Sequence, residues 1–271
     1  MIYVTGDIHG GYGNGEDMHK LSVKRLKENN IILTENDYLV ILGDFGLPFL
    51  KKEIGERKGE YTFWIKWLSE KPCTILWVDG NHENFEFWEN QPITEWNGGK
   101  VQLHPKANNV IHLMRGEVYE IEGKKIFTFG GAMSHDKERR MCDKNSPKQD
   151  WWEQETCSVA ECENAIRNLE KHEYCVDYVF THTPPAHITV QISDEYYGDR
   201  TALFLSTLSD LEYKVWCSGH VHKDFVSPIN KFCSFYQAVM SLSEAERRIR
   251  IASRLEQKEA KRSKKNDKLI C

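Results

Sequence analysis

The sequence lacks the features that mark secreted, membrane-spanning and repeat proteins. No apolar run approaches the roughly 20 residues that a transmembrane helix needs, and no basic segment with an apolar stretch precedes the strand-like Ile2–Thr5. The eight cysteines are scattered and include no Cys-x-x-Cys pair, which is typical of free thiols in a reducing compartment. We find no internal repeat. We therefore expect a cytoplasmic protein that makes no contact with membranes.

The chain also lacks the excess of positive charge that a broad nucleic-acid-binding face requires. It contains 36 Lys and Arg against 41 Asp and Glu, which gives a net charge of −5. Residues 241–271 hold ten Lys and Arg and five Asp and Glu, so residues 1–240 carry a net charge of −10. The basic tail is thus the one segment where nucleic-acid contact is a reasonable hypothesis. A solvated helix of mixed charge is the simpler interpretation.

Short apolar runs rich in β-branched residues alternate with segments of helical periodicity, which predicts a layered α/β domain. The strand-like runs are Ile2–Thr5, Tyr38–Leu42, Thr74–Val78, Lys125–Phe129, Val176–Phe180, Lys214–Cys217 and Phe232–Tyr236, and the helical segments include Met18–Glu28, Tyr61–Ser69 and Val159–Lys171. Several further strand-like runs between Val101 and Gly130 predict a second sheet there. We expect one domain over residues 1–242, followed by a charged, basic helix or tail over 243–271.

Five short polar segments each follow a strand-like run. They are Gly6-Asp7-Ile8-His9-Gly10, Gly43-Asp44-Phe45-Gly46, Gly80-Asn81-His82-Glu83, Thr181-His182-Thr183-Pro184-Pro185 and Ser218-Gly219-His220-Val221-His222. The carboxyl ends of the strands in an open α/β sheet meet at one edge, where ligands bind. Carboxylate, imidazole and amide oxygen donors without thiolate suit a divalent transition ion. Any one segment alone would be ordinary turn chemistry, but five in succession favour a metal site.

In these segments the sequence resembles the calcineurin-like metallophosphoesterase superfamily, whose pattern is D-x-H, G-D, G-N-H-[DE], H and G-H-x-H in this order. The resemblance extends from Asp7 to His222, and the form of the blocks is similar to bacterial and phage members. It implies a four-layer αββα sandwich in which two mixed β-sheets are flanked by helices. It also implies two divalent metal ions, with Mn expected and Fe, Zn, Ni or Mg as alternatives.

The resemblance implies a role for each residue of the motifs. Asp44 would bridge the two ions. Asp7, His9 and His222 would bind one ion, and Asn81, His182 and His220 would bind the other. Two neighbouring cations acidify a water molecule to a nucleophilic hydroxide and hold the phosphate oxygens in line. His82 would contact the scissile phosphate and protonate the leaving oxygen, so His82 and Asp44 are the expected catalytic residues.

Departures from the pattern narrow the expected substrate. Protein Ser/Thr phosphatases carry G-D-x-x-D-R-G and H-G-G, whereas this chain has Gly43-Asp44-Phe45-Gly46-Leu47 and His182-Thr183-Pro184-Pro185, which disfavours a protein phosphatase. The segment around Asn81 is also similar to lariat-debranching nucleases, but this sequence retains Asp7.

The polar stretch from Ser134 to Trp152 has no periodicity and predicts a long loop, a length that is often functional. It begins in a segment that resembles a Gly-Gly-Ala-x-Ser-x-Asp-Lys signature of the same superfamily. We expect its polar side chains to bind substrate, namely Ser134, Asp136, Lys137, Arg139 and Arg140. A solvated loop is an equally good interpretation. Trp151 and Trp152 would stack on a base or, more simply, anchor the packing.

The resulting hypothesis is a dinuclear metal-dependent phosphoesterase that uses a metal-activated hydroxide. A phosphodiester, nucleotidic or within nucleic acid, is slightly favoured over a phosphorylated small molecule with a monoester bond. A non-catalytic scaffold on the same fold is the competing hypothesis, although such a protein would be expected to have lost ligands, and none is missing here.

Overall fold

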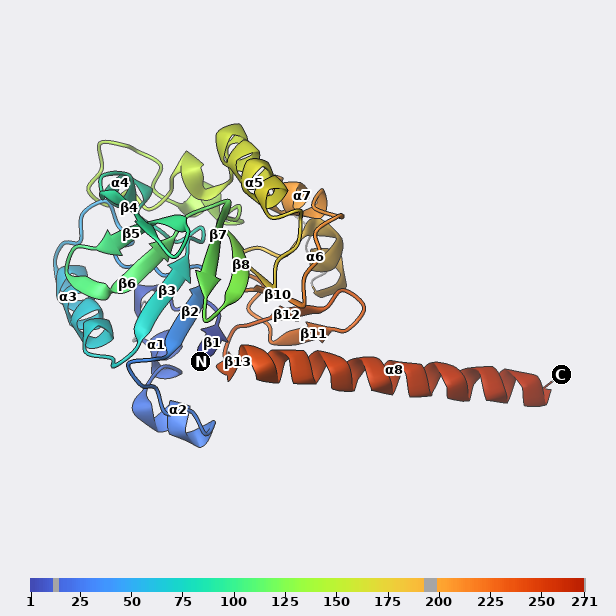
Figure 1. Cartoon of the computed structure of the whole chain (residues 1–271). Coiled ribbons are helices and arrows are strands. Elements are labelled where there is room, and N and C mark those ends of the chain that lie inside the picture. Colours follow the sequence, from blue (N-terminus) through green and yellow to red (C-terminus); the bar gives the residue numbers. More distant parts are fainter. Residues whose placement is uncertain (12–14, 193–198, 271) are drawn as a thin grey trace.

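A computed structural model of the chain describes residues 1–11, 15–192 and 199–270 (Figure 1). Two mixed β-sheets form its centre. The first has the strand order β13-β1-β2-β3-β6-β5-β4, and the second has the order β11-β12-β10-β9-β8-β7. The first sheet consists of β1 (Ile2–Thr5), β2 (Tyr38–Leu42), β3 (Thr74–Val78), β4 (Ile93–Trp96), β5 (Gly99–His104), β6 (Ala107–Leu113) and β13 (Met240–Ser241). The second consists of β7 (Glu117–Ile121), β8 (Lys124–Phe129), β9 (Tyr178–Thr181), β10 (Val215–Ser218), β11 (Phe225–Ser227) and β12 (Phe232–Ser234).

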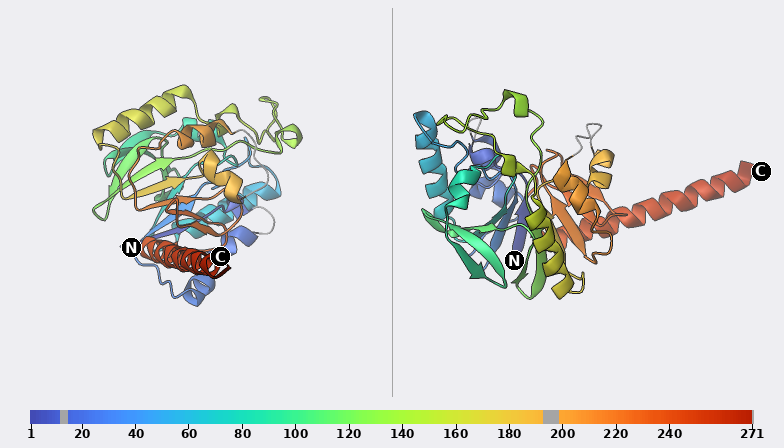
Figure 2. Two further views of the ribbon diagram at one scale, coloured as in Figure 1. Left: turned by 90° about the vertical axis from the view of Figure 1, so that its right-hand side faces the viewer. Right: turned by 90° about the horizontal axis from the view of Figure 1, so that it is seen from above.

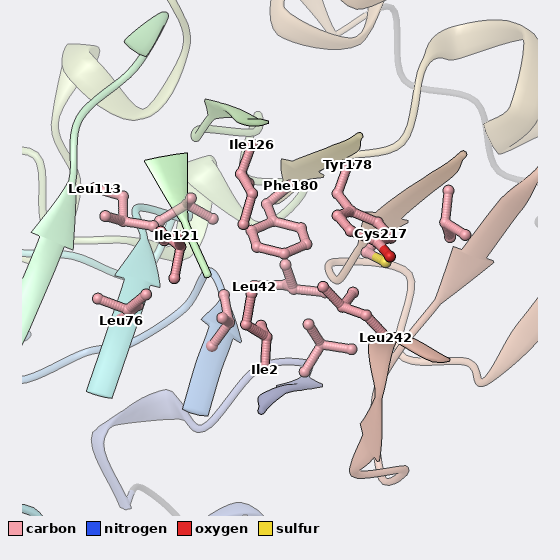
Figure 3. Close-up of a cluster of buried hydrophobic side chains, with 14 of the residues drawn as sticks. Ile2, Leu42, Leu76, Leu113, Ile121, Ile126, Tyr178, Phe180, Cys217 and Leu242 are labelled. Carbon is pink, nitrogen blue, oxygen red and sulfur yellow. The ribbon is translucent and has the colours of Figure 1, made fainter. Parts of the chain in front are cut away.

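The two sheets face each other across a buried apolar core (Figure 3). Ile2 and Val4 of β1 point into this core, and Tyr3 between them points to the opposite face, as the alternation of a strand requires. Tyr178 and Phe180 of β9 contribute from the other sheet. Strands β1, β2, β3 and β6 are parallel, as are β8, β9, β10 and β12.

Helices cover the outer face of each sheet (Figure 2). On the first sheet lie α1 (Glu16–His19), α2 (Val23–Glu28) and α3 (Glu56–Ser69), and α4 (Phe85–Glu89) follows β3. On the second lie α5 (Val159–Lys171), α6 (Ala186–Ile192) and α7 (Arg200–Ser206). The order helix, sheet, sheet, helix confirms the predicted four-layer αββα sandwich.

The structure corrects two details of the sequence prediction. The strand-like segment Val101–Gly130 does not form a second sheet by itself, because β5 and β6 pair with β3 in the first sheet and only β7 and β8 join the second. The predicted helix Met18–Glu28 is two helices, because the Ser22 side chain accepts a hydrogen bond from the backbone of Arg25 and starts α2.

Helix α8 (Leu242–Ile270) extends away from the two sheets (Figure 1). Its first turns belong to the core, because Leu242, Ala245 and Ile249 are members of the buried apolar cluster. Farther along, Ile251 and Leu255 are 41% and 54% exposed. Among the described helices, none combines the length and apolarity needed to cross a bilayer.

Candidate metal centre and catalytic site

The predicted ligands follow five strand ends that meet at one edge of the sandwich. Asp7 follows β1, Asp44 follows β2, and Asn81 follows β3 in the first sheet, whereas His182 follows β9 and His220 follows β10 in the second. His9 and His222 lie two residues beyond Asp7 and His220. Residues separated by more than two hundred positions thus meet, since the backbone N–H of His220 lies 3.2 Å from Asp7 Oδ1.

The backbone of these turns is held in an uncommon conformation. His9, Asp44, His220 and His222 have φ angles of 45°, 47°, 67° and 48°, in the left-handed region that residues other than glycine rarely adopt. Such strain persists where the surroundings determine the conformation, and it gathers at functional sites. Gly80 allows the close approach, because a Cβ atom there would lie 2.1 Å from Asp44 Oδ1.

Two overlapping groups of side chains have the spacing of metal ligands. In one, His9, Asp44 and His222 offer ligand atoms within 4.8 Å of one another, and in the other Asp7, Asp44 and His182 do so. Asp44 belongs to both groups: its Oδ2 lies 3.3 Å from His9 Nε2, and its Oδ1 lies 3.3 Å from His182 Nε2. A carboxylate shared in this way has the position that a bridging ligand requires.

The two remaining ligand candidates adjoin the second group. Asn81 Oδ1 lies 3.1 Å from His182 Nε2, and the His220 ring centroid is 4.9 Å from that of His182. His182 Nδ1 lies 2.8 Å from the carbonyl oxygen of Leu42. A proton on Nδ1 would donate to this carbonyl and leave the Nε2 lone pair directed at Asn81 and Asp44.

The position of Asp7 differs from the ligand division that the family pattern implies. Its Oδ1 lies 3.4 Å from His182 Nδ1, whereas its Oδ2 lies 3.6 Å from His222 Nε2. Asp7 therefore belongs by its spacing to the group of His182 and also approaches His222, although the resemblance assigns it to the ion of His9 and His222. The geometry allows either assignment of Asp7. Among the described residues, Asp44 is the one that belongs to both groups.

Burial and charge show that this donor set fits divalent cations. Asp7 is completely buried, Asp44 is 2% exposed, and Asp7 Oδ2 has no hydrogen-bond partner in the described part of the chain. A buried carboxylate with an orphaned oxygen is costly unless a cation neutralises it. Around Asp7 and Asp44, the described ion-pair partners are all imidazoles, the groups that become metal ligands when they are neutral.

In the protein without bound ions, protonated imidazoles supply the positive charge that balances the buried carboxylates. Burial opposes charge on His9, but its hydrogen bonds to Asp17 and Asp44 raise the pKa of His9 to about 10. Burial likewise opposes charge on His182, and the neighbouring Asp44 raises its pKa to about 9. Burial opposes charge on Asp44, but the neighbouring imidazoles, above all His182, hold the pKa of Asp44 well below its usual value. Metal binding at these imidazoles therefore displaces protons.

A layer of outer contacts, which sequence patterns did not predict, holds the ligands of the first group. Asp17 Oδ2 lies 2.8 Å from His9 Nδ1, and its Oδ1 accepts a hydrogen bond of 3.1 Å from Gln237. Tyr236 stacks on His222 with ring centroids 4.5 Å apart. A buried Lys20 donates to the carbonyl oxygens of Asp7 and Tyr236.

His82 lies beside the shared carboxylate. Its backbone N–H donates to Asp44 Oδ1 at 2.9 Å, and its ring centroid is 5.2 Å from that of His9. Burial, with a contribution from Arg140, lowers the pKa of His82 to about 4. An anionic phosphate placed against this ring would favour its protonated form.

Two of the predicted substrate-binding residues reach the site itself. Ser134 is buried, and its Oγ accepts hydrogen bonds from Asn81 Nδ2 at 3.1 Å and from Arg140 Nη1 at 3.4 Å. The Arg140 side chain is only 5% exposed. Its Nη1 lies 3.3 Å from His82 Nδ1, and its Nη2 lies 3.3 Å from the buried Glu155. Arg140 thus contacts the predicted proton donor directly.

The other three predicted substrate residues lie farther out. Asp136 pairs with Arg140 at 3.5 Å, and Lys137 Nζ stands 4.1 Å from the centroid of the Trp151 ring. Arg139 is exposed and lines a neighbouring cavity. Trp152 is buried and packs edge-on against Phe85, so it serves as a packing anchor. Between Ser134 and Trp152 the structure has a single 3-10 turn at Lys137–Arg139, which confirms the predicted long loop.

Glu83, the last residue of the Asn81 motif, connects two of the ligand loops. Its buried carboxylate accepts backbone hydrogen bonds from Phe45, Gly46 and Gly80 at 2.8, 2.9 and 3.1 Å. It thereby fixes the turn of Asp44 against the turn of Asn81. The motif contains this residue, but the pattern alone gives it no structural role.

Asp79, another buried acid near the site, belongs to a separate network. It pairs with Arg115 and lies 3.3 Å from His112 Nε2. Arg115 also donates to the carbonyl oxygens of Gln154 and Glu155. This network ties the end of β3 to the segment that carries Glu155.

The chain is similar to known proteins at the level of its family. A family model described as calcineurin-like phosphoesterase matches residues 1–224. A solved chain with 12% sequence identity and a TM-score of 0.44 covers 86% of this chain and 88% of its own length. The phosphopantetheinyl hydrolase of Mycobacterium tuberculosis is similar at 13% identity and a TM-score of 0.40, over 86% of each chain. No curated protein matches the sequence.

Proposed function

Because the chain belongs to the calcineurin-like phosphoesterase family, it is a metal-dependent phosphoester hydrolase, and we propose that its reaction takes place at the two ligand groups joined by Asp44. The sharing of Asp44 between the groups is the observation that carries this proposal. We assign His9 and His222 to one ion, and Asn81, His182 and His220 to the other. Asp7 completes the first set, as the family pattern implies. Mn is the ion we expect, with Fe, Zn, Ni or Mg as alternatives.

Bound ions would supply an acidified water and would neutralise the charge of the phosphate. The chain's own residues would position the reacting groups. Asp44, held by the backbone N–H groups of Asn81 and His82 at 2.9 Å each, would keep the ligand loops in register. His82 would hold the phosphate and donate a proton to the leaving oxygen.

Arg140 would orient His82 for this task. Its guanidinium lies 3.3 Å from Nδ1 of His82, and this contact would fix the orientation of the ring, with Nε2 on the opposite side. Glu155 and the carbonyl oxygen of Asp150 hold Arg140 in place. In this assignment Ser134 contacts both Asn81 and Arg140 and would hydrogen-bond to the bound phosphate.

We favour a phosphodiester, nucleotidic or within nucleic acid, as the substrate. Trp151 is partly exposed beside Lys137, and an aromatic ring with a cation suits a base and its phosphate. A phosphomonoester is the second candidate, since a protonated His82 would serve either leaving group. The described cysteines form no disulfide, which supports a reducing, cytoplasmic location.

The proposal is tested by metal content and turnover together. Protein loaded with Mn should bind two ions per chain and hydrolyse bis-p-nitrophenyl phosphate faster than p-nitrophenyl phosphate. Two bound ions without turnover of either ester would support the non-catalytic scaffold instead. Faster turnover of the monoester would assign the protein to the phosphomonoesterases.

A further inference from the structure

A cavity of about 430 Å³ lies beside the proposed catalytic site, on the other side of Arg140. Four cationic side chains line it, namely Arg57, Arg139, Arg140 and Lys148, and the acid in the lining is Asp150. The volume falls within the range of about 300–1,000 Å³ that small-molecule sites occupy. Arg140 connects the two places, because its Nη1 lies 3.3 Å from His82 Nδ1.

Two of the four cations are uncompensated. Arg57 pairs with Glu53 and Glu60, and Arg140 pairs with Asp136, Asp150 and Glu155. Arg139 and Lys148 are exposed, and neither pairs with a carboxylate in the part of the chain that the structure describes. Two free positive charges match the charge of about −1.5 to −2 on a phosphate monoester at neutral pH.

The walls of the cavity are joined by the backbone. Lys51 N–H donates to the carbonyl oxygen of Gln149, and Lys52 N–H donates to that of Pro147, both at 2.9 Å. These bonds fasten the segment after β2 to the long loop that carries Arg139 and Lys148.

Apolar side chains make up the rest of the lining. This apolar part of the lining consists of Leu50, Ile54 and Met141. The side chains of Ile54 and Met141 are each 43% exposed. An inorganic ion would gain nothing from these groups. An organic group that carries a phosphate would cover them and pair with the cations at the same time.

We propose that this cavity binds a second phosphate group of the substrate, on the organic moiety attached to the phosphoester that is hydrolysed. The inference rests on the proposed function and specifies its substrate class as a phosphoester with a further phosphate nearby, such as a nucleotide unit phosphorylated at its other end. Arg139 and Lys148 would provide the charge, and Arg140 would separate the two phosphates.

Two chromogenic esters test this inference, the p-nitrophenyl ester of thymidine 5′-phosphate and the same ester carrying a 3′-phosphate. With the Mn-loaded full chain, kcat/KM should be at least about tenfold higher for the 3′-phosphorylated ester, mainly through KM. In an Arg139→Gln/Lys148→Gln double variant this ratio should fall toward one. Lys144→Gln, an exposed lysine of the same loop outside the cavity lining, should leave the ratio unchanged.

Salt supplies a second measurement that needs no variant. Raising the ionic strength from 0.05 to about 0.5 M should lower the ratio in the unaltered protein, because exposed charges are screened. A ratio near one at low salt, or a ratio that the double variant leaves unchanged, would overturn the second phosphate site and leave the proposed hydrolysis intact. Hydrolysis of neither ester by protein with two bound ions would overturn the proposed function as well.

Discussion

The two ligand groups that share Asp44 differ sharply in their surroundings. His182, in one group, is completely buried, whereas in the other His222 has a side chain that is 47% exposed. The buried group is held by the strand ends themselves, and the exposed group is held by outer contacts from Asp17 and Tyr236. We infer that an ion in the buried group would support the fold, whereas an ion in the exposed group would exchange more readily and meet the substrate.

The variant Asp44→Asn changes the one described residue that the two groups share, so it should have the largest effect on activity. An amide cannot offset the charge of two cations, and we expect kcat/KM to fall by roughly 10³-fold or more. The measurement is turnover of bis-p-nitrophenyl phosphate with added Mn. Asp210→Asn, the same change at an exposed position, should be neutral. A near-normal rate in Asp44→Asn would refute the shared role.

The variant His82→Ala removes the proposed proton donor and leaves both groups intact. The rate should fall by roughly 10²–10⁴-fold, with two ions still bound as measured by elemental analysis. The loss should be greater for esters with poor leaving groups, since these depend most on protonation. Equal losses for good and poor leaving groups would argue against proton donation by His82.

A pair of histidine variants sharpens the contrast between the groups. His182→Ala removes the completely buried imidazole that pairs with both Asp7 and Asp44, so the metal-free protein should lose roughly 3–5 kcal/mol of unfolding free energy. His222→Ala, at the exposed position, should weaken binding of one ion and change the unfolding free energy little. Urea denaturation and metal titration of both variants would provide the comparison. Equal destabilisation by the two changes would contradict the proposed difference.

The smallest effect is expected from Asp17→Asn. The amide loses the charge that orients His9, and outer partners of metal-binding histidines typically contribute 10–100-fold in affinity. One of the two ions should therefore bind more weakly, as measured by isothermal titration with Mn, and the other should be unaffected. Glu16→Gln removes the same charge at the adjacent exposed residue and should change neither affinity. Unchanged binding in Asp17→Asn would exclude the orienting role.

The positions of the motif residues could be predicted because each follows a strand directly. A strand end fixes where the next two or three residues lie, so Asp7, Asp44 and His182 were predictable from local pattern. The outer contacts depend instead on how distant segments meet. Asp17 lies eight residues after His9, and Gln237 lies 220 residues after Asp17.

The sheet assignment shows the same limit. Strands β6 and β7 are separated by a short connection, yet they belong to different sheets. Local alternation indicates that both are strands but contains no information on their partners, because pairing is decided by which faces bury apolar side chains together. For the same reason the position of Arg140 against His82 was not predictable from the loop that carries it.

The central claim is that Asp44 joins two neighbouring ions. Electron paramagnetic resonance of the Mn-loaded protein tests this claim most directly. Two neighbouring Mn²⁺ ions with a common carboxylate should give a spin-coupled multiline spectrum at two ions per chain, and this spectrum should be lost in Asp44→Asn. A spectrum of isolated, uncoupled Mn²⁺ at full occupancy would contradict the account.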